Sequence, residues 1–172
     1  MRKLFCVAIG LILLPAILCA ADTTPILKRE AGKCALAWQR QDFVGIIAYL
    51  PPRVVAQYGG RATVLRELKD QFAQARSLGV ERMEALSGRA PMPRQFGSLL
   101  ASVVPVTAIL HSAHLDLTQQ THVLAVSSDQ GKRWFFMLLY QVTQAELNAW
   151  FPEFAGKVVV PDDSAPQMDF VY

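Results

Sequence analysis

The sequence contains few cysteines and no concentrated charge. Two of its three cysteines, Cys6 and Cys19, lie within the first 20 residues. Without that segment Cys34 stands alone, which excludes an internal disulfide and favours a small buried residue over a nucleophile. Loss of Arg2 and Lys3 leaves 15 basic residues against 14 acidic ones, so the net charge falls from +3 to +1. With no dense Lys/Arg run, the sequence predicts no binding to nucleic acid.

Several catalytic and nucleotide-binding motifs are also missing. The chain has no G-x-G-x-x-G and no G-K-[ST] phosphate loop, so Gly59 and Gly60 are interpreted as the break before a helix. Ser127 and Ser128 are not part of a G-x-S-x-G elbow, which leaves acyl transfer without a visible nucleophile.

The first 20 residues have the layout of a secretory signal peptide. Arg2 and Lys3 precede an apolar run, residues 4–18, and small residues follow at 19–21. The run is interrupted by Gly10 and Pro15 and is shorter than the ~20 residues that a spanning helix needs. We therefore expect a Sec-type signal peptide over residues 1–20, a periplasmic or secreted protein, and no membrane span after cleavage.

The position of the cleavage site is less defined than the segment itself. Cleavage after Ala20 and cleavage after Ala21 both fit the small-residue step. Leu18, which precedes Cys19, argues against a lipoprotein, because that position usually holds a small side chain. The remaining 152 residues suit one domain, which we place at residues 21–161, followed by a loosely held C-terminal tail at 162–172.

The first half of this domain is predicted to be helical. Thr24 and Pro25 begin an apolar stripe of helical spacing that reaches Trp38. Asp42 can cap a second short helix, which the proline pair at 51–52 ends. A third helix is expected over residues 61–78.

The second half is predicted to form strands and then a short helix. We expect strands over 80–86, over 99–111 with a bend or bulge at Pro105, over 121–127 and over 132–141. The chain reverses over 112–120 and again at the turn 128–131. Thr143 and Glu146 have the spacing of a capping box for the last helix.

This order predicts an α+β fold with N-terminal helices packed on a curved antiparallel sheet, in a cone-like arrangement. The strand at residues 133–140 is apolar on both faces. If helices cover one face, the other face requires a second layer, a cavity or a partner.

Two segments carry a resemblance to a known family: DFVGIIAYLPPRVVAQYGGRATVLRELK and THVLAVSSDQGKRWFFMLLY. They resemble the cone-shaped, nuclear-transport-factor-two-like (SnoaL-like) superfamily, in particular its secreted bacterial members. The shared positions are the turn and core residues Gly59, Gly60, Arg61, Ser127, Asp129, Gly131, Lys132, Trp134 and Phe136. The resemblance implies the fold more than an activity. Enzymes of that superfamily line the cone with an Asp or His base and a Tyr or second acid, and no such set matches here.

The histidines and two of the aspartates are candidate metal ligands or bases. His111, His114 and His122 lack the spacing of a zinc site, so no metal and no cofactor is predicted, and surface positions on a hairpin are favoured. Asp42 or Asp116 could act as a base beside a tyrosine, but helix capping and a hairpin turn explain them more simply.

The function predicted from these observations is a non-catalytic, secreted binding module of the bacterial envelope. It would hold a protein partner or a small apolar ligand. If the partner is a protein, the module could be a homodimer, or an inhibitor or immunity-type protein. Five aromatic residues are the predicted ligand-binding set: Trp38, Tyr49, Tyr58, Trp134 and Phe136. The alternative is an isomerase, dehydratase or cyclase with a buried Asp or His base in the cone, which makes enzyme activity uncertain but disfavoured.

Overall fold

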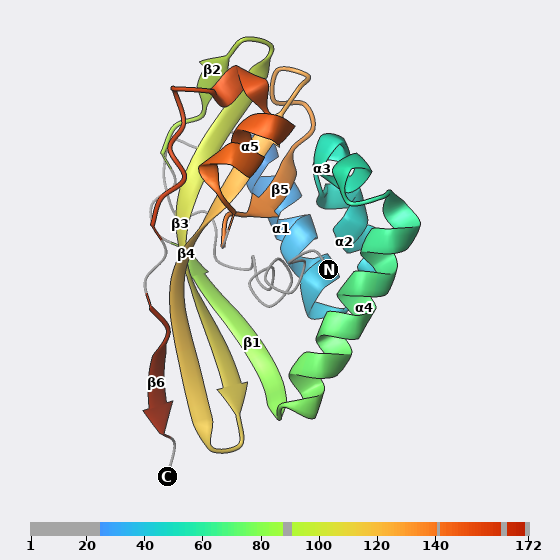
Figure 1. Ribbon diagram of the computed structural model, residues 1–172, viewed down its shortest axis with the longest axis vertical. Helices are drawn as coiled ribbons and strands as arrows, with labels where there is room; N and C mark the ends of the chain where they lie inside the picture. Colours follow the sequence, from blue (N-terminus) through green and yellow to red (C-terminus); the bar gives the residue numbers. More distant parts are fainter. Residues whose placement is uncertain (1–24, 88–90, 141, 163–164, 171–172) are drawn as a thin grey trace.

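The computed structural model describes residues 25–87, 91–140, 142–162 and 165–170 (Figure 1). The predicted signal peptide, residues 1–20, lies outside the described residues. The helical elements are α1 (Pro25–Gln39), α2 (Phe43–Tyr49), α3 (Pro52–Gln57), α4 (Arg61–Ser77), α5 (Gln144–Trp150) and the 3-10 turn η2 (Pro152–Phe154). The strands are β1 (Val80–Ser87), β2 (Arg94–Phe96), β3 (Leu99–Ser112), β4 (Leu115–Ser127), β5 (Phe135–Leu138) and β6 (Gln167–Phe170).

Among these residues, the six strands form one antiparallel, strongly curled sheet with the first helices packed against it (Figure 1). The predicted α+β class and cone-like arrangement are therefore confirmed. Two predicted helix starts are also confirmed. Asp42 caps α2 by accepting a hydrogen bond from the Gly45 amide at 2.9 Å, and Thr143 with Glu146 forms the capping box of α5. Helix α3 and strand β2 were not predicted.

The β3–β4 hairpin forms the centre of the sheet. Its strands pair without a register shift from Leu100 opposite Ser127 to His111 opposite Asp116. The turn between them is tight, because the Ser112 hydroxyl accepts from the Leu115 amide at 3.1 Å and donates to the Leu115 carbonyl at 2.9 Å. Strand β4 therefore starts at Leu115, where the sequence had predicted a reversal continuing to residue 120.

Pro105 lies inside β3 and pairs with His122 without a register shift, so of the predicted bend or bulge the bulge is wrong. On the edge of β3 that faces away from β4, strand β1 pairs from Val106 onward, and β2 pairs only as far as Ala101. In the described part of the chain, no strand faces Pro105 on that edge, and its side chain is exposed. Proline has no amide hydrogen, and at this position the sheet therefore loses no hydrogen bond.

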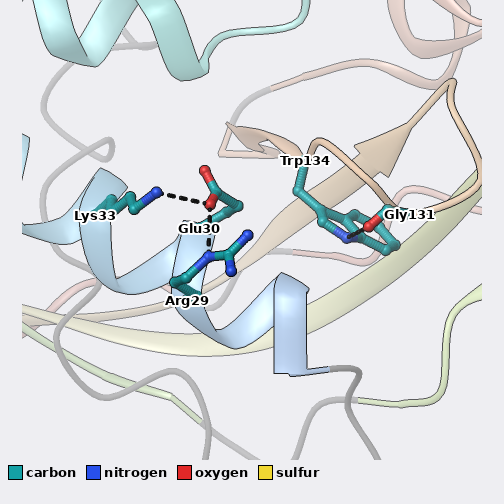
Figure 2. Close-up of polar contacts among 5 residues, drawn as sticks. All are labelled: Arg29, Glu30, Lys33, Gly131 and Trp134. Atoms are coloured by element: carbon teal, nitrogen blue, oxygen red, sulfur yellow. Dashed lines mark hydrogen bonds and ion pairs between the residues drawn. The ribbon is translucent and has the colours of Figure 1, made fainter.

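The turn that joins β4 to β5 is built from side chains of its own sequence. The buried Ser127 hydroxyl donates to Asp129 at 2.9 Å and accepts from the Gly131 amide at 2.9 Å. Asp129 also accepts from the Arg133 amide at 2.9 Å, and the Trp134 indole donates to the Gly131 carbonyl at 3.1 Å (Figure 2). Four of the residues that carry the resemblance thus have structural roles in this turn: Ser127, Asp129, Gly131 and Trp134.

The two faces of the sheet have different coverings. On the face toward α1, here called the α1 face, β-strand residues pack with α1, α2 and α4: Val104, Val106, Val123, Ala125, Phe136 and Leu138. On the opposite face, called the α5 face, strand residues pack with α5 and η2: Leu99, Ala101, Leu124, Val126 and Met137. Successive residues along each strand point to opposite faces, as the pleat of a β-strand requires.

The α5 face of strand β5 is therefore covered by the same chain. Leu147, Phe151 and Phe154 are almost completely buried against it. Two contacts join this second layer to α3: Arg53 bonds both Glu153 carboxylate oxygens at 2.9 Å, and the Tyr58 and Trp150 rings lie 5.9 Å apart. The apolar character of β5 on both faces thus requires no partner.

The C-terminal segment also joins the sheet. Residues 167–170 form β6 and pair with β4 from Leu115 to Thr118 (Figure 1). The prediction of a loosely held tail after residue 161 did not anticipate this strand, because four residues with one large apolar side chain before Phe170 give little strand signal. In the part of the chain that the structure describes, no helix has both the length and the apolar character to cross a membrane.

We expect Phe154→Ala to lower the free energy of unfolding by about 3–5 kcal/mol, because it leaves a cavity in the layer over the α5 face. Urea denaturation measures the loss. Val159→Ala is the control, since Val159 is 77% exposed and its truncation should change stability by less than about 0.5 kcal/mol. A small effect of Phe154→Ala would contradict the covering role of η2.

We expect Asp129→Ala to destabilise the protein more at pH 7 than at about pH 2. The Arg133 amide, with a further hydrogen bond from the Ser127 hydroxyl, holds the pKa of Asp129 below its usual range. Its stabilisation is therefore present above the unfolded pKa of ~3.9 and is lost as the pH falls through the folded pKa. Urea denaturation across this range measures the difference, with the exposed Asp162→Ala as control. An equal loss at every pH would contradict the role of the carboxylate.

Candidate functional site

A cavity lies beside β4, between the ends of β5 and β6. Strand β5 pairs with β4 from Val123 onward, and β6 pairs with β4 only up to Thr118. Between these two pairings, the chain after β5 still contacts β4, since the Leu139 amide donates to the His122 carbonyl at 2.8 Å. The interruption leaves space at the edge of the sheet that neither strand fills.

The cavity has a volume of about 60 Å³ and is partly open to solvent. This is several times the volume that one water molecule requires. Its walls come from β3, β4 and the segments that flank β5 and β6: Ala108, Leu110, Leu117, Gln119, Thr121, Tyr140 and Pro166. The strand residues of this lining lie on the α1 face, since Val106 pairs with Thr121 and Ala108 with Gln119.

The lining is mainly apolar and carries no charge. Among the described residues it contains no lysine, arginine, histidine or carboxylic acid. Its polar groups are the side chains of Gln119, Thr121 and Tyr140. Such a surface favours a neutral ligand, because an ion placed there would lose water without gaining an opposite charge.

Thr121 differs from the other buried hydroxyl residues. The residue is 1% exposed, and within the described ranges its Oγ1 has no hydrogen-bond partner. The buried hydroxyls of Ser102 and Ser127 are bonded instead, the first to the Pro91 carbonyl at 2.8 Å. Gln119, beside Thr121 in the lining, donates from Nε2 to the Gln120 carbonyl at 3.2 Å.

The five aromatic residues predicted to bind a ligand lie elsewhere. Trp38, Trp134 and Phe136 are almost fully buried in the core between α1 and the sheet. Tyr49 packs near Phe136, with ring centroids 6.2 Å apart, and Tyr58 packs on Trp150. None of the five lines the cavity, so their binding role stays a prediction and their observed contacts are those of core residues.

The acids and histidines considered as bases also lie away from the cavity. Asp42 is occupied as the cap of α2. His111 Nδ1 lies 2.8 Å from Asp116 Oδ1 across the hairpin, and both residues are on the α5 face by register, as is His122. Within the described ranges, no group of three or more His, Cys, Asp or Glu side chains is arranged to hold a metal ion.

A polar cluster around Glu30 was not predicted from the sequence. Glu30 lies on α1 between Arg29 at 3.1 Å and Lys33 at 3.0 Å (Figure 2). Burial opposes ionisation, but these two cations hold the pKa of Glu30 below its usual range. Burial and the nearby Glu30 carboxylate raise the pKa of Tyr49. The carboxylate is thus held in its charged form, which suits an ion pair more than a base.

Glu67 on α4 is an acid whose environment has features of a buried base. Its Oε2 is buried without a hydrogen-bond partner, and burial raises its pKa. Burial, with contributions from Glu146 and Glu67, raises the pKa of Tyr58 to about 12. Glu67 does not line the cavity beside β4.

Sequence reasoning missed the cavity and most of its lining, although a signal was present. Alternate residues of β4 on the α1 face run from Leu115 to Ala125 and are apolar except Gln119 and Thr121. Two adjacent polar residues on an otherwise apolar strand face mark a place where the core is interrupted. Tyr140 and Pro166 also line the cavity, but they are too distant in the sequence for any local pattern to predict that they lie beside Gln119 and Thr121.

Comparison with known proteins found no matching family model, no matching curated protein and no matching solved structure.

We expect Cys34 to resist alkylation in the folded protein. Burial raises the pKa of the Cys34 thiol to about 12, so little thiolate forms near neutral pH. Iodoacetamide labelling, mapped by mass spectrometry to the peptide that contains Cys34, measures its reactivity with and without urea. Rapid labelling without urea would contradict the buried position and would reopen intermolecular pairing through this thiol.

Proposed function

We propose that this protein is a non-catalytic binding module that holds a small apolar ligand in the cavity beside β4. The observation that carries the proposal is the partly open, uncharged lining between the ends of β5 and β6. Ligand sites in proteins are typically concave and apolar with a few polar groups, and this cavity has that composition. A protein partner on the α5 face of the sheet is less favoured, because α5 and η2 already cover it.

Binding is favoured over catalysis by where the titratable groups lie. An isomerase or cyclase needs a base within hydrogen-bond reach of its substrate. Asp42 caps a helix, and His111, Asp116 and His122 face away from the cavity. The lining supplies hydroxyl and amide groups, which can orient a ligand but do not exchange protons readily at neutral pH.

The envelope location is part of this proposal. It is supported by the sequence of residues 1–20, with its basic start and apolar run. The resemblance to secreted members of the nuclear-transport-factor-two-like superfamily supports the same location and a cone-shaped ligand site.

We expect n-hexane, supplied through the vapour phase, to bind in the cavity and Ala108→Leu to abolish that binding. Ala108 is 6% exposed and lies in the lining, so a larger side chain occupies the space. Amide chemical shifts in ¹H–¹⁵N NMR spectra locate the bound hexane and report whether the variant is folded. Overpacking is expected to cost no more than about 1–3 kcal/mol of stability.

Ala113→Leu is the matched control, because it makes the same change at an exposed residue of the same hairpin. It should bind hexane as the unmodified protein does. Absence of hexane-induced shifts at β3 and β4 in the unmodified protein would overturn the proposed ligand site.

A further inference from the structure

The Thr121 hydroxyl is a polar group that the protein leaves without a partner. Thr121 lines the cavity on the α1 face, the residue is 1% exposed, and Oγ1 makes no hydrogen bond in the described structure. A buried hydroxyl without a partner lowers stability relative to a methyl group of the same shape. A ligand atom that bonds Oγ1 would remove this cost.

The chemistry of the surrounding surface restricts which ligand could do so. Leu110, Leu117 and Ala108 provide an apolar wall, which accepts an aliphatic body. The absence of charge among the described lining residues disfavours a carboxylate or an ammonium group. A threonine hydroxyl both donates and accepts, so it can bond either a hydroxyl or a carbonyl group.

The volume restricts the ligand further. About 60 Å³ of partly open space holds a short chain, and it is far below the several hundred Å³ of sites for large ligands. A bulky ring system would not fit without displacement of Tyr140 or Pro166, which close the cavity at the ends of β5 and β6.

We infer that the cavity takes a short, neutral aliphatic molecule with one hydroxyl or carbonyl group, and that Thr121 is the residue that selects this polar group. This inference rests on the proposed ligand-binding function and adds the chemical class of the ligand. Thr121 acts by accepting or donating one hydrogen bond inside a mainly apolar site, where a hydrogen bond is stronger than in bulk water.

Thr121→Val tests the inference, because valine has nearly the same shape and lacks the hydroxyl. The probes are 1-hexanol, n-hexane and hexanoate at pH 7, and NMR titration gives their dissociation constants. We expect the substitution to weaken the binding of 1-hexanol about tenfold and to leave the affinity for n-hexane unchanged or slightly higher. Hexanoate should bind at least 100-fold more weakly than 1-hexanol to the unmodified protein.

A second readout is independent of any ligand. Since Oγ1 has no partner, Thr121→Val should raise the melting temperature by a few degrees. Thr107→Val is the control, because Thr107 lies on β3, is half-buried and faces away from the cavity. It should change neither the affinity for 1-hexanol nor the ratio between the two neutral probes.

The outcomes separate this inference from the proposed function. If n-hexane binds but Thr121→Val weakens both neutral probes equally, the inference is wrong and the apolar site stands. A lower melting temperature for Thr121→Val would likewise contradict it, since it would mean that the hydroxyl has a structural partner. If no probe binds to the unmodified protein, the proposed function itself is wrong.

Discussion

The continuous pairing of β3 with β4 is the constraint on which the rest of the structure depends. Every other strand among the described residues pairs with one of these two, and none of them pairs with another. Their register therefore decides which side chains face α1 and which face α5. A slip of one residue would move Thr121 and Gln119 to the opposite face and bring His122 and Asp116 to the cavity side.

The cavity follows from the unequal lengths of the hairpin and its neighbours. The hairpin strands have 14 and 13 residues, whereas β5 and β6 have four each and occupy separate parts of the same edge. Two short strands cannot cover the full edge of a long one. Among the described residues, Thr121 pairs with Val106 of β3 but with neither β5 nor β6, and a ligand is one way to satisfy its unbonded hydroxyl.

Much of the local structure could be predicted because it depends on residues close together in the chain. The cap at Asp42, the capping box at Thr143 and the turn after Ser127 each involve contacts within four residues. The prediction for the five aromatic residues depends on residue type, and type does not distinguish a core side chain from one that lines a cavity. Trp134 illustrates this, since its indole is bonded within its own turn and is fully buried.

The sequence by itself determined the order of the longer helices and strands and the ends of most helices, since spacing and capping act over a few residues, but it did not predict α3, β2 or β6. It also determined the residues of the β4–β5 turn. Only the tertiary structure decided that α5 and η2 cover the second face of the sheet, that residues 167–170 return to β4, and that a cavity separates them from β5. These features join segments far apart in the chain, and their positions depend on the register of the long hairpin and on packing, which no local pattern encodes.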